Sequence, residues 1–476
     1  SALLFITAAN VHKIMAIAYK FFPLFYRLER IFYFCKNLKS MEKAPDIPQH
    51  SLLQAIVELQ QDNELRSFIE DLNDEYGYWD RIKYIRNSSH KSPDELWALI
   101  KAQRFISNVS VKNWGKYNIH FALTDRMQRQ CHSFDINFGG RWEYETTIPE
   151  KTKERYLISS LMEEAISSSM MEGASTTRRI AKEMLRKKMS PADKSQQMIF
   201  NNYETIQFIV THKSEPLTTE LLLQVHRLMT DSTLDNPEDS GRFRQNDQVV
   251  VENAITHEIV HTPPTYTELP HFMETLCDFF NNPESRPYIH PIIKGIIIHY
   301  MIAYMHPFVD GNGRTARAIF YWYMLRQGYW LMEYLSISRI IYRSKPSYEK
   351  SFLYAEIENN DLGYFITYHM RVLELAFRDM QEYIKRKTKE REAAHQYLGK
   401  SGINERQAEI IKMFDDNPNE VMTVKDVQVK FRITPTTAKS DIIKLVRLGL
   451  LKEIAVNKVK RAYIKSDSFE QILSNL

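Results

Sequence analysis

The sequence contains few cysteines and no paired cysteine motif. Its three cysteines, Cys35, Cys131 and Cys277, are widely spaced over 476 residues and include no CxxC pair. This spacing excludes a disulfide framework and a cysteine-based zinc site, and it is typical of free thiols in a reducing compartment. We therefore predict a cytoplasmic protein with buried, structural cysteines.

Long uncharged apolar runs are also missing. The first 40 residues are rich in Phe, Tyr, Leu and Ile, but Lys13, Lys20 and Arg27 divide them into pieces too short to span a bilayer. Residues 291–305 are apolar but include a lysine and a histidine. We therefore expect no membrane-spanning segment, while an amphipathic surface anchor in the first 40 residues stays open.

A strong net charge is absent from the body of the chain. The total is +4, and residues 1–40 contribute +5, so everything after them sums to −1. The overall charge therefore gives no sign of a nucleic-acid partner. We interpret residues 1–40 as an upstream extension outside the fold, with Met41 as the natural start.

Helical patterns dominate the rest of the sequence. Residues 41–149 read as a mostly helical N-terminal domain, in which Ser92, Pro93 and Glu95 form a capping signature before a periodic apolar run. Residues 150–395 are more strongly helical, with segments predicted at 156–170, 218–229, 269–280, 292–305, 314–327 and 362–385. Two short Val- and Ile-rich runs, 248–252 and 258–262, predict a single hairpin within this helical domain.

The most informative stretch is His306-Pro-Phe-Val-Asp-Gly-Asn-Gly-Arg-Thr-Ala-Arg317, between two apolar helices. Gly311 and Gly313 flank Asn312 where the backbone must turn tightly and a helix begins at once. Successive N–H groups in such a turn, together with the helix dipole, form a cradle for phosphate oxygens. The sequence therefore predicts an anion site here.

The side chains of this stretch suit a nucleoside triphosphate. Asp310 can hold Mg²⁺ directly or through water, and Asn312 can hydrogen-bond a phosphate oxygen. Arg314 and Arg317 share one helix face and offer forked contacts to further phosphates. His306, across the loop, can take the proton from a hydroxyl that attacks phosphorus.

At these positions the chain resembles the Fic family, whose motif is HxFx[D/E]GNGRxxR. Every specified position is matched, from His306 and Phe308 through Asp310-Gly311-Asn312-Gly313-Arg314 to Arg317. The resemblance implies a protein adenylyltransferase that transfers AMP from ATP to a Tyr, Thr or Ser hydroxyl of a protein target. It assigns His306 as the base, Asp310 to Mg²⁺, the loop glycines and Asn312 to the α-phosphate, and both arginines to the β- and γ-phosphates.

The resemblance extends to two further segments. Gly241-Arg-Phe-Arg244, the predicted hairpin and Pro263-Pro264 resemble the family's flap, in which Val260, His261 and Thr262 would pair with the backbone of the target. Ser168-Ser169-Met170-Met171-Glu172-Gly173 matches the family's inhibitory pattern [S/T]xxxE[G/N], with the serine at 168 and the glutamate at 172. The resemblance implies that Glu172 pairs with Arg317 and keeps ATP in an unproductive pose.

Residues 403–465 resemble a winged helix-turn-helix. Helices are predicted at 404–413, 424–431 and 434–448, followed by a turn and a basic wing containing Lys458, Lys460 and Arg461. Thr436, Thr437, Lys439 and Ser440 would face a DNA groove. The alternative, that this module only packs on the core or binds a protein, stays equally open.

The sequence thus predicts a mainly α fold with a Fic-like helical core, a small β-hairpin flap, a helical N-terminal region and a C-terminal winged helix. The predicted divisions are residues 1–40, 41–149, 150–395 and 396–476. The alternatives to an autoinhibited adenylyltransferase are a DNA-binding regulator with a nucleotide-sensing core and a bifunctional enzyme that also removes AMP. Transfer of phosphocholine or UMP and formation of a homodimer stay open.

Overall fold

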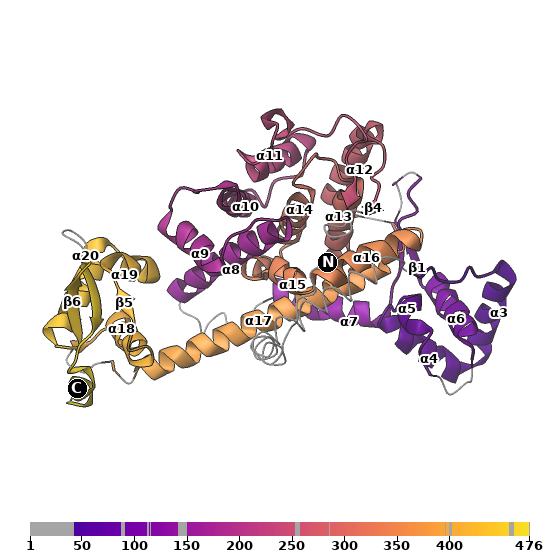
Figure 1. The fold of residues 1–476 in the computed structure, drawn as a ribbon. Coiled ribbons are helices and arrows are strands. Elements are labelled where there is room, and N and C mark those ends of the chain that lie inside the picture. Colours follow the sequence, from indigo (N-terminus) through magenta and orange to yellow (C-terminus); the bar gives the residue numbers. More distant parts are fainter. Residues whose placement is uncertain are drawn as a thin grey trace, which may run out of the picture. The chain divides into compact units, whose positions relative to one another are not determined.

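The protein is described here from a computed structural model, which is mainly helical (Figure 1). The structure describes residues 42–475, except 87–90, 112–113, 115, 141–149, 253–257, 285, 396, 399–401 and 457–460. The predicted extension of residues 1–40, Met41, and the wing residues Lys458 and Lys460 therefore lie outside the described residues. Within the described residues no helix is both long enough and apolar enough to cross a membrane.

The chain divides into two compact units. The first contains the described residues up to Ser175 together with Asp193–Leu373, and the second contains Thr176–Ala192 together with Glu374–Leu476. The second unit therefore combines a C-terminal module with a short segment that comes from the middle of the sequence.

The N-terminal region of the first unit is a group of helices with one small sheet. Its elements are α3 (Gln49–Gln61), α4 (Asn63–Asp74), α5 (Trp79–Ile82), α6 (Pro93–Ile106), β1 (Asn108–Ser110), β2 (His120–Ala122), α7 (Asp125–Phe134) and the π-helical turn η2 (Asp135–Gly139). The predicted capping signature is confirmed, because Ser92 and Glu95 form a reciprocal capping box at the start of α6.

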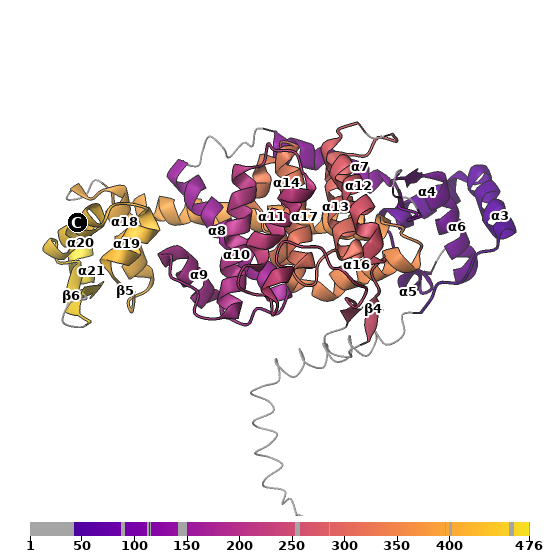
Figure 2. The ribbon, with the colours of Figure 1, turned by 90° about the horizontal axis from the view of Figure 1, so that it is seen from above.

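The core of the first unit is a cluster of helices around α13 and α14. Its elements are α8 (Glu150–Met171), α10 (Lys194–Thr211), α11 (Thr219–Thr230), η4 (Pro237–Asp239), η5 (Tyr266–Glu268), α12 (Leu269–Asn281), α13 (Pro291–Met305), α14 (Asn312–Arg326), η6 (Trp330–Tyr334), α15 (Ile337–Arg343), α16 (Lys345–Ile357) and the first part of α17 (Gly363–His395). Helices α13 and α14 pack on each other in the middle of this cluster (Figures 1 and 2). Nearly every residue of both helices is buried, which fixes the loop between them.

The predicted core helices are present with small shifts at their ends. The largest difference is α17, which was predicted to end near Lys385 and runs on to His395 through the charge-dense segment. The predicted hairpin is present but shorter: β3 (Val251–Glu252) pairs antiparallel with β4 (Ile259–His261), with a register shift between Val251 and Glu252.

The second unit contains a compact C-terminal module. Its elements are α9 (Arg178–Lys187), the end of α17, α18 (Glu405–Asp416), β5 (Val421–Met422), α19 (Val424–Phe431), α20 (Pro435–Arg447), β6 (Leu451–Ala455), β7 (Arg461–Lys465) and α21 (Phe469–Asn475). The three strands form one antiparallel sheet in the order β5-β7-β6. The three predicted helices are all found, and Asn404, Thr423 and Thr434 cap them.

Candidate active site

The motif residues lie in a tight loop that joins α13 to α14. The loop begins at His306, whose φ of 47° is left-handed, and ends at Gly311, whose φ of 83° favours glycine. A Cβ at Gly311 would also lie 2.9 Å from the side chain of Thr230. The chain enters α14 at Asn312 without a side-chain cap, so the first backbone N–H groups of α14 point out of the helix toward any anion placed there.

The side chain of Asn312 holds this loop closed. Its Oδ1 accepts a hydrogen bond from the backbone N–H of Phe308 at 2.9 Å, and its Nδ2 donates to the carbonyl of Phe308 at 2.8 Å. These bonds satisfy buried backbone groups that a short connection between helices would otherwise leave unpaired. The sequence predicted that Asn312 contacts a phosphate oxygen. That contact stays a prediction, because both amide atoms are engaged within the loop.

The ring of Phe308 anchors the loop by stacking on His226 of α11. The two ring centroids are 3.7 Å apart with an interplanar angle of 4°. The backbone N–H of Gly241 donates to His226 Nδ1 at 3.0 Å, so the ring proton lies on Nε2, which donates to the carbonyl of Asp310 at 2.9 Å. Burial lowers the pKa of His226 to about 4, which keeps this neutral tautomer at neutral pH.

Arg244 ties the loop to the segment that carries the flap. Its backbone N–H donates to the carbonyl of Pro307 at 2.9 Å, and its Nε donates to the carbonyl of His306 at 3.0 Å. The other guanidinium nitrogens donate to the Asp247 carboxylate at 2.8 Å and to the carbonyl of Pro264. Because one buried guanidinium reaches all of these groups, the backbone at His306 is held on both sides.

His306 has the geometry of a base with a defined tautomer. Its Nδ1 lies 3.2 Å from the carbonyl of Ala303, and since a carbonyl can only accept, the proton belongs on Nδ1. The lone pair is then on Nε2. Burial lowers the pKa of His306 to about 4. The imidazole is therefore neutral at physiological pH and able to accept a proton.

Arg314 is a buried cation with unused donors. Only 1% of its surface is exposed, and its Nη1 donates to the carbonyl of Met229 at 3.3 Å. Its Nε and Nη2 are buried without a hydrogen-bond partner in the described part of the chain, and the nearest carboxylate oxygen of Asp310 is 3.5 Å from Nη2. Burying an unsatisfied guanidinium is costly. A ligand that supplies anionic oxygens would satisfy it.

Asp310 lies at the mouth of the loop, with 52% of its side chain exposed. Among the described residues no group of three or more His, Cys, Asp or Glu side chains is placed to hold a metal ion. A single exposed carboxylate beside a phosphate site is nevertheless how proteins commonly hold Mg²⁺, which takes its other ligands from phosphates and water. Asp310 therefore fits the ion only together with a phosphate ligand.

Arg317 is fully engaged by helix α8. Its Nε donates to Ser168 Oγ at 2.9 Å, and its Nη2 donates to the Ser168 carbonyl at 3.1 Å and to Glu172 Oε1 at 2.9 Å. Burial by itself raises the pKa of Glu172, but the positive charges of Arg317 and Arg314 outweigh it and hold that pKa below its usual value. The carboxylate is therefore ionised and paired.

Glu172 lies directly over the start of α14. A Cβ built on Gly313 would clash with Glu172 Oε1, so a larger residue at 313 would push the carboxylate out of its present position. The position is fixed by the end of α8, where Gly173 has a φ of 93° and the N–H of Ala174 donates to the carbonyl of Ser169, the pattern of a Schellman cap. Lys345 also donates to the carbonyl of Met171 at 3.2 Å.

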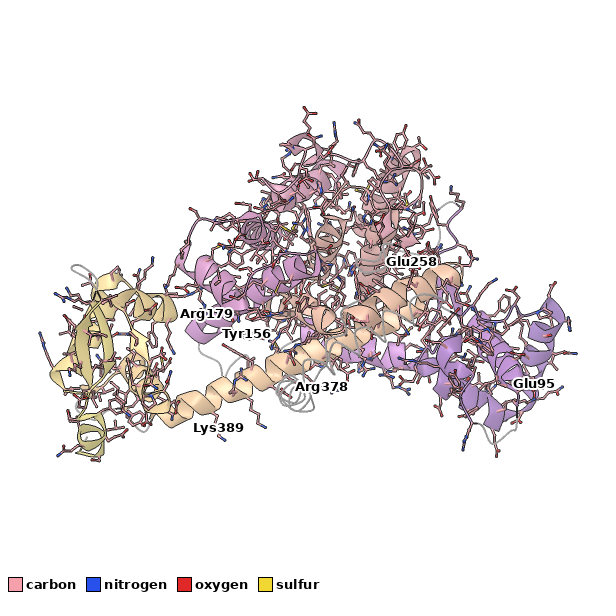
Figure 3. The ribbon with its side chains drawn as sticks, in the orientation of Figure 1. Glu95, Tyr156, Arg179, Glu258, Arg378 and Lys389 are labelled. Atoms are coloured by element: carbon pink, nitrogen blue, oxygen red, sulfur yellow. The ribbon has the colours of Figure 1, made fainter. Side chains whose placement is uncertain are left out.

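The predicted flap residues occupy β4 and the residue after it. Val260 is half-buried, Thr262 is exposed, and the side chain of His261 points into the protein. His261 Nε2 lies 2.7 Å from the carbonyl of Tyr304 and its Nδ1 lies 2.9 Å from Glu356. The side chain of His261 therefore anchors the strand, and only its backbone is available to a partner. Glu258, just before β4, is labelled in Figure 3.

Comparison with known families decides the assignment of this site. The Fic/DOC family matches residues 216–324, which span α11, the hairpin, α13, the loop and most of α14. The chain contains a Fic domain. Every motif residue described above lies inside the matched range, whereas Ser168 and Glu172 lie before it.

The chain is similar to curated proteins named protein adenylyltransferase Fic. A protein adenylyltransferase Fic from Nematostella vectensis is 29% identical over 170 residues, which cover 34% of this chain and 37% of that protein. One from Drosophila willistoni is 33% identical over 113 residues, covering 24% of this chain and 20% of that protein. The match therefore spans about a fifth to about a third of these relatives' length.

Solved structures give a partial likeness. A Fic family protein from Desulfovibrio desulfuricans is 17% identical, with a TM-score of 0.47 over 73% of this chain and 98% of that chain. The Fic-1 protein from C. elegans is 19% identical, with a TM-score of 0.45 over 73% of this chain and 90% of that chain.

The structure of the Fic domain brings together residues that the sequence named separately. Ser168 and Glu172 meet Arg317 across almost 150 positions, and Asp310 lies beside Arg314. His306 faces the same loop from the end of α13. The flap residues approach this group through His261, which bonds the last turn of α13.

Two residues that support the site were not recognised from the sequence. His226 and Arg244 both bond the backbone of the motif loop, and both are almost fully buried. His226 looks like an ordinary packed histidine on the apolar face of α11, and nothing local distinguishes it. Arg244 stands in the Gly-Arg-Phe-Arg segment that the sequence assigned to the flap, so its position was noted while its contacts were not.

Glu164 is a third unrecognised residue, and it fastens α8 to the Fic core. It is 2% exposed. It accepts hydrogen bonds from the hydroxyls of Tyr321 at 2.9 Å and Ser336 at 3.0 Å, and from the backbone N–H of Ser338 at 2.9 Å. Burial raises the pKa of Glu164. One turn before Ser168 and two turns before Glu172, it fixes the helix that carries both residues.

Proposed function

We propose that the chain is a protein adenylyltransferase that transfers AMP from ATP to a Tyr, Thr or Ser hydroxyl of a protein target. One observation carries the proposal. The unsatisfied donors of buried Arg314 lie beside the uncapped start of α14, on the same loop as the neutral imidazole of His306. A phosphate site next to a base suits attack of an alcohol on phosphorus.

The phosphates of ATP would occupy the start of α14. The backbone N–H groups at Asn312 and Gly313 would bind the α-phosphate, joined by that of Gly311 once it releases Asp310 Oδ1. Arg314 would donate from Nε and Nη2 to the neighbouring phosphate. Asn312 would act mainly by holding the loop in shape, as its present bonds to Phe308 suggest. Asp310 would hold Mg²⁺, which when bound with ATP neutralises phosphate charge.

The reaction would then need one proton transfer and one displacement. The target hydroxyl gives its proton to Nε2 of His306 while its oxygen bonds to the α-phosphorus. The bond from that phosphorus to the bridging oxygen breaks, and pyrophosphate leaves with the electron pair. AMP remains on the target oxygen. Arg244, through the carbonyl of His306, keeps the imidazole in place during this step.

The target segment would be placed by the flap. Within the described residues β4 pairs only with β3, so its other edge offers backbone groups to an added strand. Val260, His261 and Thr262 would form this edge. Because the side chain of His261 is used to anchor the strand, recognition there would depend on main-chain hydrogen bonds.

Glu172 would act as an inhibitor within the same chain. It occupies Arg317 and lies against Gly313, so an incoming γ-phosphate would compete with its carboxylate for the same guanidinium. Two anions at one cation repel each other. ATP would therefore bind in a pose that does not align the α-phosphate for transfer.

The proposal is tested by labelling with ATP that carries a radioactive α-phosphate. We expect Glu172→Gly to increase auto-modification on the order of tenfold or more, since couplings of this kind are worth about 1–3 kcal/mol. Glu172→Gly combined with His306→Ala should show none. Glu204→Gly, an exposed glutamate in neighbouring α10, controls for loosening of a helix.

The outcomes separate the two parts of the proposal. Equal labelling of the wild type and Glu172→Gly would remove the inhibitory role and leave the enzyme. Labelling that persists without His306, or that is absent from every variant while ATP binds, would overturn the adenylyltransferase. Mass spectrometry of the product shows whether the mass gained is that of AMP.

DNA binding by residues 403–465 is the second candidate function. The element order α18-β5-α19-α20-β6-β7 agrees with the winged helix-turn-helix predicted from the sequence. Helix α20 exposes Thr436, Lys439 and Ser440, three of the four side chains predicted to face a groove, while Thr437 is half-buried. A gel shift with duplex DNA, titrated with salt, tests this function.

A further inference from the structure

Residues 41–476 are almost neutral in total, but the two compact units into which they divide carry large and opposite net charges. Residues 41–175 and 193–373 hold 31 Lys and Arg and 42 Asp and Glu, a net charge of −11. Thr176–Ala192 and Glu374–Leu476 hold 26 Lys and Arg and 16 Asp and Glu, a net charge of +10. A charge of this size on a small unit attracts polyanions.

Much of the positive charge comes from α9, which the sequence did not connect with the C-terminal module. Residues 178–188 contain six basic side chains and one acidic one. Helix α9 buries Ala181, Met184 and Leu185, and on its other faces it exposes Arg179 and Arg186. It is therefore amphipathic, with a basic outer surface. Arg179 is labelled in Figure 3.

Helix α9 is connected to the helix-turn-helix through α19. Lys187 Nζ lies 3.8 Å from the carboxylate of Asp426, in the first turn of α19. Helix α19 packs on α20, whose outer face carries exposed Lys439 and Arg447. Neither of these two side chains forms an ion pair within the described part of the chain, so both are open to phosphates.

We propose that α9 and α20 are two contact elements of one duplex-DNA-binding surface, α20 entering the major groove and α9 contacting the flanking phosphates. The proposal rests on the second candidate function and adds to it an element from outside residues 403–465. Helix α9 is about 15 Å long at 1.5 Å per residue, comparable with the groove width of about 12 Å. It can therefore follow the backbone at a groove edge.

Duplex DNA fits this surface better than a membrane. Three of the four apolar residues of α9 are buried in the protein and only Ile180 is exposed, so α9 offers no apolar face to a bilayer. Helix α20 begins with short hydroxyl side chains, which can approach base edges closely. The charge around them is exposed, as binding of a phosphate backbone requires.

The test measures the salt dependence of DNA binding by the full chain. Fluorescence anisotropy with a labelled duplex of about 20 base pairs, two helical turns, gives the affinity between low and moderate NaCl. A plot of log affinity against log salt has a negative slope, and each lost phosphate contact makes this slope less steep by about 0.9. We expect Arg179→Gln with Arg186→Gln to reduce the magnitude of the slope by about 2. Lys439→Gln with Arg447→Gln should reduce it by a similar amount.

A matched control removes the same charge from the acidic unit. Arg81 and Arg286 are exposed there, and Arg81→Gln with Arg286→Gln should leave the slope unchanged. Binding by the wild type with an unchanged slope in the α9 variant would overturn this proposal and leave DNA binding by α20. No salt-dependent binding by the wild type would overturn DNA binding itself. Equal affinity for phosphatidylserine vesicles would overturn the assignment to duplex DNA.

Discussion

The two units of this protein each bury a charge opposite in sign to their own net charge, and the two buried charges differ in how they are satisfied. The acidic unit buries Arg314, of which two nitrogens have no hydrogen-bond partner among the described residues. The basic unit buries Asp441, which accepts from Asn404 at 2.9 Å, from Gln407 at 3.0 Å and from Arg406 at 2.6 Å. A buried charge with all its partners belongs to the fold, and one without them is free for a ligand.

The two units also differ in whether the cations of their proposed binding sites are buried or exposed. In the acidic unit the two arginines of the proposed phosphate site, Arg314 and Arg317, are both buried. In the basic unit Arg179, Arg186, Lys439 and Arg447 are exposed to solvent or nearly so. Buried donors recognise a small anion by geometry, whereas exposed cations bind a long one by releasing counterions.

The largest expected effect is a contrast in salt dependence. Raising NaCl from about 50 to about 200 mM should weaken DNA binding by the basic unit on the order of 1,000-fold, if about six phosphates are contacted. ATP binding to Glu172→Gly should weaken by less than tenfold, because its charges are buried and poorly screened. Isothermal titration of ATP and anisotropy of DNA under the same buffers measure both. Equal salt slopes would break the comparison.

Replacing Arg314 should separate binding from stability. We expect Arg314→Gln in the Glu172→Gly background to reduce ATP affinity about 100-fold, since charge-assisted hydrogen bonds to phosphate contribute about 1.5–3 kcal/mol each. The melting temperature should stay level or rise, because an unsatisfied buried charge is removed. A clear fall in melting temperature with unchanged ATP affinity would show that Arg314 belongs to the fold.

Replacing Asp441 should give the opposite result. We expect Asp441→Asn to destabilise the basic unit by about 2 kcal/mol, roughly a 30-fold change in its unfolding equilibrium, because Arg406 loses its partner. ATP affinity should be unaffected. Urea unfolding followed by proteolysis of the C-terminal module measures the first effect and isothermal titration the second. The matched control is Asp467→Asn, which changes an exposed carboxylate.

The smallest effect concerns pH. Burial lowers the pKa of His306 to about 4, so the base is neutral above that value and loses activity only as the pH falls toward it. A histidine at its usual pKa near 6.5 would lose about tenfold at pH 5.5. We therefore expect kcat/KM of Glu172→Gly for ATP to stay nearly constant from pH 7 to 5.5. A tenfold fall over this range would place His306 in a more exposed setting.

Buried histidines also link stability to pH in a defined direction. The pKa values of His226 and His306 are both lowered to about 4 by burial, so the unfolded chain binds more protons below pH 6.5. The free energy of unfolding is therefore unaffected by these groups above pH 6.5, and they decrease it as the pH drops from 6.5 toward 4. The same direction applies to His369, whose pKa burial lowers to about 3.

Much of the architecture followed from local patterns. The capping box at Ser92, the helices around the motif and the hairpin were all predicted, because caps and apolar periods depend on residues a few positions apart. Helix α17 was predicted too short, since the charge-dense run after Lys385 resembles a linker although its residues are good helix formers. Helix α9 was not predicted at all.

The site was predicted in composition and less well in its contacts. The motif named His306, Asp310, Arg314 and Arg317, and the structure places them on one loop and helix. The motif could not show that the Asn312 side chain hydrogen-bonds the backbone of Phe308. Nor could it show that Arg244 and Glu164 hold the surrounding segments in place. Those bonds join residues far apart in sequence, and no local pattern reports them.

The sequence by itself determined the chemistry-bearing residues and their spacing, because the motif and the helix that follows it are contiguous. Only the tertiary structure decided that α8 brings Glu172 onto Gly313 and Arg317. It also decided that α9 joins the C-terminal unit, so that residues 41–476, with a net charge of −1, divide into −11 and +10. The physical reason is that charge and hydrogen-bond partners depend on which surfaces pack together, and packing is set by contacts between distant segments.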